Sequence, residues 1–494
     1  MKLRLSVLVR TVICALVALA GKAQLAPLDP VKRGEALARQ LCVSCHLFPA
    51  PELLDKKSWE FGALPMMANR LGVKALKPDS AENRMILEDW SQITAYYLSA
   101  APAEALPQPP RAPVTTNLTR FIAEPAPYRP SAFNISMVKI DGSRIYVGNA
   151  EKMSLDELDS AGRLVSSFNT SNPVVAMDIR KEGAFVSMIG TLSPSETPLG
   201  KVSWFERGAN WIPQWEVADK LHRPTALAFA DLNGDGREDV IVTTFGHITG
   251  HFSWFENLGN HQYAERLLID RPGAVRAHVV DFNKDGQPDI VVMMAQGKEG
   301  IFLLGNVGNG KFVELNLLEH HPAWGSASFE LADIDHDGDL DIITANGDNG
   351  EFNSCLKNYH GVRIYLNDGK VGFAEKYFFP LYGAFKAVPA DFDGDGDLDI
   401  AAIAYFADFE GSPHEAFVYL ENTGGLNFKP STFPASIDGR WLTFDVGDID
   451  GDGDLDIVLG AANRAPYQVP KSIAKRWETG PAVMILRNTT RTRK

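Results

Sequence analysis

Five acidic loops of one pattern constrain the fold of this chain more than any other feature. Each reads Asp-x-Asp/Asn-x-Asp-Gly-x-x-Asp followed by Val or Ile, and the loops begin at Asp231, Asp281, Asp333, Asp391 and Asp448. Oxygen atoms at positions 1, 3, 5 and 9 converge on one point only if the backbone curls tightly, and the Gly at position 6 permits that curl. Because hard oxygen ligands at this density are typical of Ca²⁺ sites, the sequence predicts about five calcium ions.

The predicted calcium ligands are the side chains at positions 1, 3, 5 and 9 of each loop. They are Asp231, Asn233, Asp235, Asp239, Asp281, Asn283, Asp285, Asp289, Asp333, Asp335, Asp337, Asp341, Asp391, Asp393, Asp395, Asp399, Asp448, Asp450, Asp452 and Asp456. An EF-hand would place a bidentate Glu at position 12, where this chain has Val242, Val292, Thr344, Ala402 and Leu459. A helix-loop-helix is therefore excluded, and each loop leads directly into an apolar β-run.

The spacing of the loops predicts a β-propeller. Successive loops begin 50, 52, 58 and 57 residues apart, which is the period of a propeller blade. After each loop comes a short apolar strand, then a strand that ends in Asn, and then a turn that opens a third strand. Two earlier segments, 137–149 and 175–204, keep this alternation without the acidic loop, so we expect seven blades.

The two ends of the propeller sequence are expected to meet in one sheet. The last blade stops at Asn488 with only a basic tail after it, so its third strand is missing. We expect residues 118–124, just upstream of the first blade, to supply that strand and to leave no free edge in the ring.

These repeats resemble the FG-GAP/VCBS family, whose calcium-loop repeats form integrin-α-like seven-bladed propellers. The five Asp loops carry the resemblance, which covers roughly three quarters of the chain if the two loop-free blades are included. The resemblance implies a fold and bound Ca²⁺. It implies no particular activity, because propellers serve as lectins, adhesins, lyases and scaffolds alike.

The net charge fits this interpretation. Of the twenty predicted ligand side chains all but Asn233 and Asn283 are carboxylates, and the 494-residue chain has a formal charge of −14. Five Ca²⁺ ions would bring that charge to about −4. Since no basic stripe opposes the acidity, a nucleic-acid partner is not expected.

The first 23 residues are typical of an export signal. Lys2, Arg4 and Arg10 precede an apolar run over residues 11–20, and small residues follow it. An uncleaved membrane anchor is the alternative, although the run is too short to span a bilayer alone. We expect a periplasmic or secreted protein with no membrane span in the mature chain.

The segment Cys42-Val43-Ser44-Cys45-His46 is the attachment motif of a c-type haem. In that chemistry the two thiolates add to the haem vinyl groups, and the adjoining His46 ligates the iron. A disulfide and a zinc half-site are the alternatives. Zinc would need a second Cys or His pair nearby, and none occurs before His222.

Residues 24–100 resemble a small monohaem cytochrome c domain. Amphipathic segments at 31–41 and 81–98 match its N-terminal helix and a helix packed across it. The resemblance extends to Leu64-Pro65-Met66-Met67, which is similar to the distal methionine loop of that family. It implies Met67 as the sixth iron ligand, with Met66 as the second choice.

Residues 101–117 are rich in Pro and Ala and predict a semi-rigid linker in which backbone packing is not expected. The predicted fold class is therefore multidomain. A small all-α cytochrome c domain (24–100) precedes an all-β seven-bladed propeller with calcium loops (118–494).

The polar loops that follow the first strand after each acidic loop emerge on one face of the ring. They are a candidate binding face or, equally, solvated loop tips. Their polar residues are His247, His251, Lys298, Glu299, Asp348, Glu351, Asn353, His360, Tyr405, Asp408, Glu410, His414, Arg464 and Tyr467.

The predicted function is electron transfer by an exported protein. Its haem c would exchange electrons with a redox partner protein, while the propeller docks that partner or holds a protein or carbohydrate-like ligand. One alternative is a haem-linked propeller dehydrogenase that oxidises a carbohydrate-like substrate, and another is a surface adhesion module with an accessory haem. Whether the chain is an enzyme stays open, and no catalytic residue is predicted.

Overall fold

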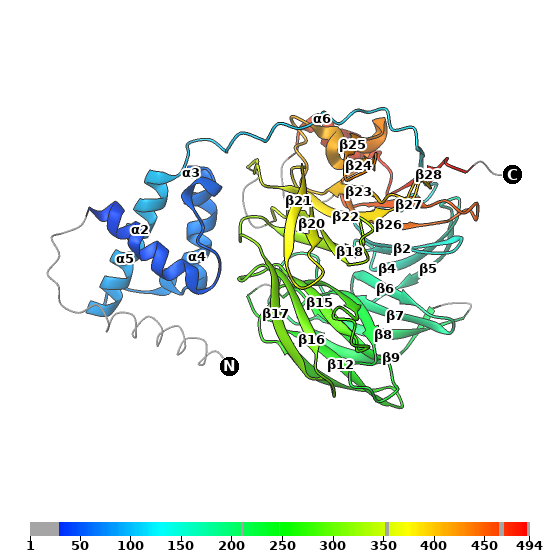
Figure 1. Cartoon of the computed structure of the whole chain (residues 1–494), viewed down its shortest axis with the longest axis horizontal. Helices are drawn as coiled ribbons and strands as arrows, with labels where there is room; N and C mark the ends of the chain where they lie inside the picture. The colour runs from blue at the N-terminus through cyan, green and yellow to red at the C-terminus, as the bar shows by residue number, and fades with distance from the viewer. Residues whose placement is uncertain (1–28, 209–210, 247, 351–354, 464–468, 492–494) are drawn as a thin grey trace. The chain divides into compact units, whose positions relative to one another are not determined.

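A computed structural model describes residues 29–208, 211–246, 248–350, 355–463 and 469–491 (Figure 1). The chain forms a helical unit and a larger β-rich unit, and the boundary between them lies after Leu106. The predicted export signal lies outside the described residues. Within the described ranges, no helix combines the length and the apolar character needed to cross a membrane.

Two helices frame the helical unit, α2 (Pro30–Leu41) and α5 (Ala81–Ala100), and both confirm predicted segments. The Asp29 side chain caps α2 by accepting a 2.9 Å hydrogen bond from the Val31 N–H, and Ser80 caps α5 in the same way. Shorter elements lie between them: η1 (Cys42–Ser44), η2 (Pro51–Leu53), α3 (Lys56–Ser58), η3 (Trp59–Ala63), α4 (Leu64–Arg70) and η4 (Val73–Ala75).

Gly34 lets α2 and α5 approach closely. A Cβ atom at this position would lie 2.0 Å from the carbonyl oxygen of Gln92, so only Gly fits there. Next to this contact the Trp59 and Tyr97 rings pack with their centroids 4.2 Å apart, inside a buried apolar core. The crossing of the two helices therefore depends on one missing side chain.

The β-rich unit consists of seven four-stranded antiparallel sheets, which confirms the predicted seven-bladed propeller. Blades 1 and 2 lack acidic loops, as expected. Blade 1 comprises β2 (Ile135–Asp141), β3 (Arg144–Asn149), β4 (Ser154–Asp159) and β5 (Leu164–Asn169). Blade 2 comprises β6 (Val174–Ile179), β7 (Gly183–Met188), β8 (Gly200–Arg207) and β9 (Trp211–Leu221).

Blades 3 to 7 each carry one acidic loop between their first and second strands. Blade 3 comprises β10 (Pro224–Ala230), β11 (Asp239–Thr244), β12 (Phe252–Gly259) and β13 (Gln262–Ile269). Blade 4 comprises β14 (Ala274–Val280), β15 (Asp289–Met294), β16 (Gly300–Asn306) and β17 (Phe312–Glu319). Blade 5 comprises β18 (Ser326–Ala332), β19 (Asp341–Asn346), β20 (Gly361–Asn367) and β21 (Phe373–Pro380).

Blade 6 comprises β22 (Ala384–Ala390), β23 (Asp399–Ala404), β24 (Phe417–Asn422) and β25 (Phe428–Ser431). Blade 7 comprises β26 (Trp441–Gly447), β27 (Asp456–Ala461), β28 (Val483–Asn488) and β1 (Phe121–Pro125). Short helices η5 (Pro413–Ala416), η6 (Pro434–Asp438) and α6 (Lys471–Glu478) lie in connections of blades 6 and 7. Strands of blade 7 lie beside β2 of blade 1, so the ring is closed (Figure 1).

The first strand of each acidic-loop blade is missing from the sequence-based prediction, which began each blade at the loop. These strands carry small and mixed residues, such as the run from Thr225 to Ala228, and their own β-pattern is weak. They become strands because each pairs with the fully buried strand that follows the loop. Each blade therefore has four strands rather than the three expected.

The predicted closure of the ring is confirmed. Strand β1 pairs antiparallel with β28, with Phe121 opposite Asn488 and Pro125 opposite Met484. Arg120 strengthens this junction, because its carbonyl accepts a 2.9 Å hydrogen bond from the Thr489 N–H. The N-terminal strand thus completes the C-terminal blade and protects its edge.

The segment predicted as an unpacked linker differs from expectation in its second half. The Arg111 guanidinium pairs with Glu415 and lies 5.2 Å from the centre of the Phe379 ring. The Thr432 N–H donates to the Thr115 carbonyl at 2.8 Å. The segment packs here because strand β25 is short, so backbone groups beyond its end are free to bond with another chain segment.

We expect Gly34→Ala to destabilise the helical unit by about 1–3 kcal/mol or more, because the added methyl group collides with the α5 backbone. Gly305→Ala is the matched control, since its nearest neighbour would be an ordinary contact at 3.8 Å. Thermal unfolding followed by circular dichroism checks both variants. Equal melting temperatures for the two variants would contradict the role of Gly34.

Candidate functional site

The five acidic loops are curled as predicted. The Gly at position 6 has φ between 84° and 99° in every loop. Its N–H donates to a carboxylate oxygen of the Asp at position 1, at 2.8 Å in the first loop and 3.2 Å in the fourth. An L side chain at position 6 would be strained, which explains why all five loops use Gly.

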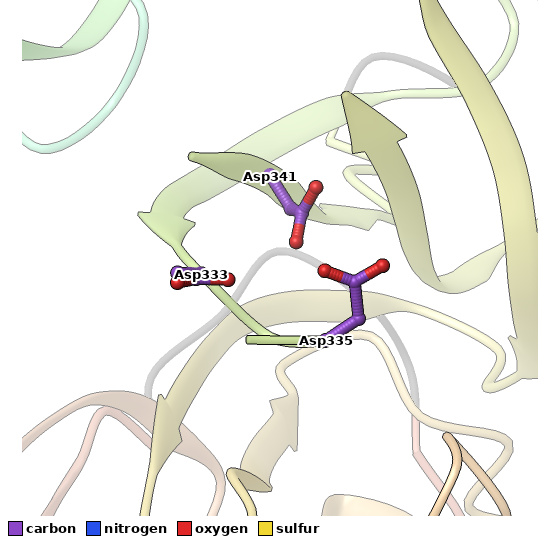
Figure 2. A group of neighbouring side chains, drawn as sticks. All are labelled: Asp333, Asp335 and Asp341. Atoms are coloured by element: carbon purple, nitrogen blue, oxygen red, sulfur yellow. The ribbon is translucent and has the colours of Figure 1, made fainter. Parts of the chain in front are cut away.

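Three of the loops bring predicted ligands together. In each of them, carboxylate oxygens of three Asp residues lie within 4.8 Å of one another. The groups are Asp333, Asp335 and Asp341; Asp391, Asp393 and Asp395; and Asp448, Asp450 and Asp456. Figure 2 shows the first group, in which the three carboxylates face a common space. Asp337, Asp399 and Asp452 are not part of these groups.

The loops of blades 3 and 4 have a different arrangement, because position 3 is an amide. The Nδ2 atom of Asn233 donates to Asp235 at 3.2 Å, and that of Asn283 donates to Asp285 at 2.9 Å. Arg237 also pairs with Asp235 at 2.5 Å. Part of the oxygen set in these two loops is thus engaged with protein donors.

The Asp at position 9 has a role that the sequence analysis did not assign. This residue is at most 1% exposed in all five loops, at Asp239, Asp289, Asp341, Asp399 and Asp456. One oxygen accepts from the backbone N–H of an Asn at or near the end of the third strand, at 2.7–2.8 Å in each of blades 3 to 7. In four blades the other oxygen accepts from the N–H of position 2, at 3.0–3.1 Å.

The partner Asn residues complete this contact with their own side chains. These residues are Asn257, Asn306, Asn367, Asn422 and Asn488, and each Nδ2 donates to the carbonyl of loop position 8 at 3.1–3.3 Å. Asn306 also donates to Leu232 of the preceding blade at 3.0 Å, and Asn488 to Phe392 at 2.7 Å. We call these hydrogen bonds between the position-9 Asp, the Asn and the loop the Asp–Asn clamp. The Asn that recurs in the third strand is the sequence feature from which the clamp could have been predicted.

Burial dominates the electrostatics of position 9. It raises the pKa of Asp239, Asp341, Asp399 and Asp456 to about 6, while the backbone donors act in the opposite direction. Neighbouring loop carboxylates add to the increase. A carboxylate that is costly to ionise in this position would be stabilised by a cation bound in the loop.

The Cys42–His46 segment follows α2 directly. Cys42 and Ser44 bound a turn of 3₁₀ helix, η1, and the exposed Cys45 comes next. His46 Nδ1 lies 2.8 Å from the Leu47 carbonyl oxygen, so it is the donor there, and Nε2 is left with its lone pair. Burial raises the pKa of the Cys42 thiol and lowers that of His46. A neutral imidazole with a free Nε2 is the form that ligates iron.

The surroundings of this segment expose apolar side chains. Val43, inside the motif, is 52% exposed, and Leu47, directly after it, is exposed as well. A small domain gains nothing by leaving these groups in water, and a flat apolar group such as a haem would cover them. The residues therefore fit a haem. Met66 and Met67 are half-buried, but they lie in helix α4 rather than in the expected loop.

The polar loops predicted as a candidate binding face are only partly exposed. Glu299 and His360 are buried, at 6% and 0% exposure. His251 is partly exposed, and its Nε2 atom lies 2.6 Å from Glu265 Oε1. His247, Glu351, Asn353, Arg464 and Tyr467 lie outside the described residues. The predicted face is thus reduced because blade packing covers some of its polar side chains.

Comparison with known families identifies three segments. The family model described as "FG-GAP-like repeat" matches residues 231–292, 281–344 and 352–402. These segments are FG-GAP-like repeats. They include four of the five acidic loops, those of blades 3 to 6, and they support the resemblance drawn from the Asp pattern.

Solved structures with similar folds are distant in sequence. BBS1N in complex with ARL6DN is 11% identical with a TM-score of 0.45, covering 74% of this chain and 96% of that chain. Saccharomyces cerevisiae Sqt1 is 9% identical with a TM-score of 0.43, covering 76% of this chain and all of the other. An ancestral GH74 enzyme is 9% identical with a TM-score of 0.44, covering 73% and 48%. No curated protein matches the sequence.

Asn306→Ala should destabilise the propeller by about 2–4 kcal/mol, because it leaves two buried carbonyls and the Gly308 N–H without partners. Asn367→Ala is the matched control. The Asn367 side chain makes the same hydrogen bonds within its blade, and among the described residues it makes none to the neighbouring blade. We expect it to cost about 1 kcal/mol less in urea unfolding, with or without EDTA. Equal losses would show that the bond between blades adds no stability.

Proposed function

We propose that this chain is an exported electron-transfer protein, with a c-type haem in the helical unit and a calcium-stabilised propeller that docks a partner. The observation that carries the proposal is the Cys42-x-x-Cys45-His46 motif, which directly follows a helix that crosses α5 at Gly34. The exposed apolar side chains beside the motif support it. Residues 1–23 would direct export to the periplasm or beyond.

When bound, a haem c supplies a one-electron carrier. The protein's own residues would hold it: Cys42 and Cys45 through thioether bonds, and His46 through Nε2. Met67 is proposed as the sixth ligand, with Met66 as the second choice. The hydrogen bond from His46 Nδ1 to Leu47 would orient the ring and raise its basicity as a ligand.

We propose Ca²⁺ as the metal of the acidic loops. The donor set consists of carboxylates, amides and backbone oxygens, which are hard ligands. The loops of blades 5, 6 and 7 offer the strongest sites, since their carboxylates already face one another. In blade 6, Arg120 lies 3.0 Å from Asp393 and competes with a cation there. The metal would hold the loop, and through position 9 it would hold the second and third strands of the blade.

The propeller is proposed as a docking module for a redox partner protein or another protein or carbohydrate-like ligand. FG-GAP-like repeats are compatible with docking or adhesion. Electron transfer with docking is preferred to the dehydrogenase alternative because the Cys42-x-x-Cys45-His46 motif indicates a redox group directly, whereas no catalytic residue is predicted.

For the haem, we expect Cys42→Ala combined with Cys45→Ala to abolish covalent attachment. The exported wild-type protein should keep its haem through acid–acetone extraction and show the reduced α-band of a c-type haem. Cys355→Ala is the control and should behave as wild type. Loss of the wild-type haem to acid–acetone would contradict the proposal. Within the holoprotein, Met67→Ala should remove the far-red sulfur-to-iron band. If Met66→Ala removes this band instead, Met66 is the sixth iron ligand.

For the metal, Asp335→Ala should reduce the thermal stabilisation that Ca²⁺ gives, because it removes one ligand oxygen without breaking a protein contact. Asp335 is exposed and makes no hydrogen bond among the described residues. In EDTA the variant should melt like wild type, because ligand-linked stability requires the ligand. Asp339→Ala, in the same loop but outside the carboxylate group, is the control; it removes the ion pair with Lys284, so any loss of stability should be equal in Ca²⁺ and in EDTA. A wild-type protein that melts identically in Ca²⁺ and EDTA would overturn the proposed calcium role.

A further inference from the structure

The centre of the propeller contains a cavity of ≈ 430 Å³. Residues of β2, β6, β10, β14, β22 and β26 line it, so it lies where the first strands of the blades converge. Neither the acidic loops nor the haem segment contributes to it. The volume is in the range of small-molecule sites.

Three residues with hydrogen-bond donors lie at equivalent positions along the strands that line this cavity. Arg276, Lys386 and Thr443 each occupy the first paired position after an irregularity in their strand, opposite Met293, Ile403 and Gly460. Because the seven first strands share one orientation around the ring, equivalent register positions lie at the same height. All three residues line the cavity.

Lys386 carries a charge without a matching carboxylate. Its ammonium donates to the Phe444 carbonyl at 2.6 Å and lies 4.9 Å from the centre of the Phe444 ring. Among the described residues, no carboxylate oxygen lies within ion-pair distance of it. Burial, together with the charge of Arg276, lowers its pKa to about 8, while the more distant carboxylates of Asp445 and Glu330 act in the opposite direction. Holding a partly buried cation without an ion-pair partner is costly, and two of its three N–H donors remain available.

Arg276 and Thr443 also have hydrogen-bond donors that no described residue accepts from. Arg276 Nη2 pairs with Glu330 at 2.8 Å and Nε donates to His278 at 3.3 Å, while Nη1 makes no bond within the described part of the chain. The Thr443 hydroxyl is likewise without a partner among these residues. The other charges on the wall are paired: Asp178 with Arg180, and Lys139 with Asp445 at 3.7 Å.

From this arrangement we propose that the central cavity binds a small organic or inorganic anion through a carboxylate or phosphate group held by Arg276, Lys386 and Thr443. The anion supplies the negative charge that Lys386 lacks and accepts the spare hydrogen bonds of all three side chains. The cavity volume suits a small molecule, so we assign the site to a ligand of that size. The site is independent of the proposed haem and calcium.

Calorimetric titration of the calcium-loaded full chain with inorganic phosphate, and separately with succinate, tests the site. We expect saturable binding of at least one anion. Binding of both anions would show that the site recognises the negative charge that they share. Binding of only one would show whether the site prefers a phosphate or a carboxylate group. Lys386→Met should weaken binding at least tenfold while melting no lower than wild type without ligand, because it removes an unpaired buried charge.

The exposed Lys429→Met is the matched control and should bind as wild type. Thr443→Val provides a second test that keeps all charges, and it should weaken binding several-fold. Absence of heat and of thermal stabilisation with both anions up to about 10 mM would overturn the proposal. Unchanged binding by folded Lys386→Met or Thr443→Val would do the same.

Discussion

The propeller depends on a buried carboxylate at position 9 of each acidic loop. This Asp begins the second strand and accepts a backbone N–H from the neighbouring third strand, and in four blades it also accepts one from its own loop. The loop lies between the first and second strands, so one side chain joins it to the third strand as well. Repeated five times, this contact sets the shape of each blade at one end of its sheet.

Such a contact has a cost, because a charged group is removed from water. The raised pKa of four of these Asp residues expresses that cost. Backbone donors offset part of it, and a divalent cation in the loop would offset more. The acidic loop and the Asp–Asn clamp therefore act together, because the Asp at position 9 belongs to both. Blades 1 and 2 have neither of these features; both have apolar cores, and in blade 1 the buried Asp156 accepts a hydrogen bond from Tyr128.

The ring adds a second level of organisation. Strand β1 completes blade 7, and Asn306 and Asn488 bond to loops of the preceding blades. Once the ring is closed, the first strands of the blades face a common centre. Residues of no special pattern in sequence then become neighbours there, and Lys386 is the clearest case, since its charge is matched by no carboxylate among the described residues.

The sequence by itself determined the features that reside in consecutive residues. The acidic loops, their period, the seven blades and the strand upstream of blade 1 were all predicted, because turn chemistry and strand alternation are local. The helices flanking the Cys42–His46 motif were predicted for the same reason. The haem and Ca²⁺ remain predictions, since they rest on residue chemistry alone.

Only the tertiary structure decided what depends on distant partners. It showed that position 9 binds two backbone N–H groups, that residues 111–118 pack on blade 6, and that Glu299 and His360 are buried. It also showed the first strand of each acidic-loop blade. The β-pattern of these strands is weak in the sequence, and they form because each pairs with a buried neighbouring strand. Arg276, Lys386 and Thr443 come from three different blades and meet only when the ring closes. Burial and convergence of this kind arise from long-range packing, which no local pattern encodes.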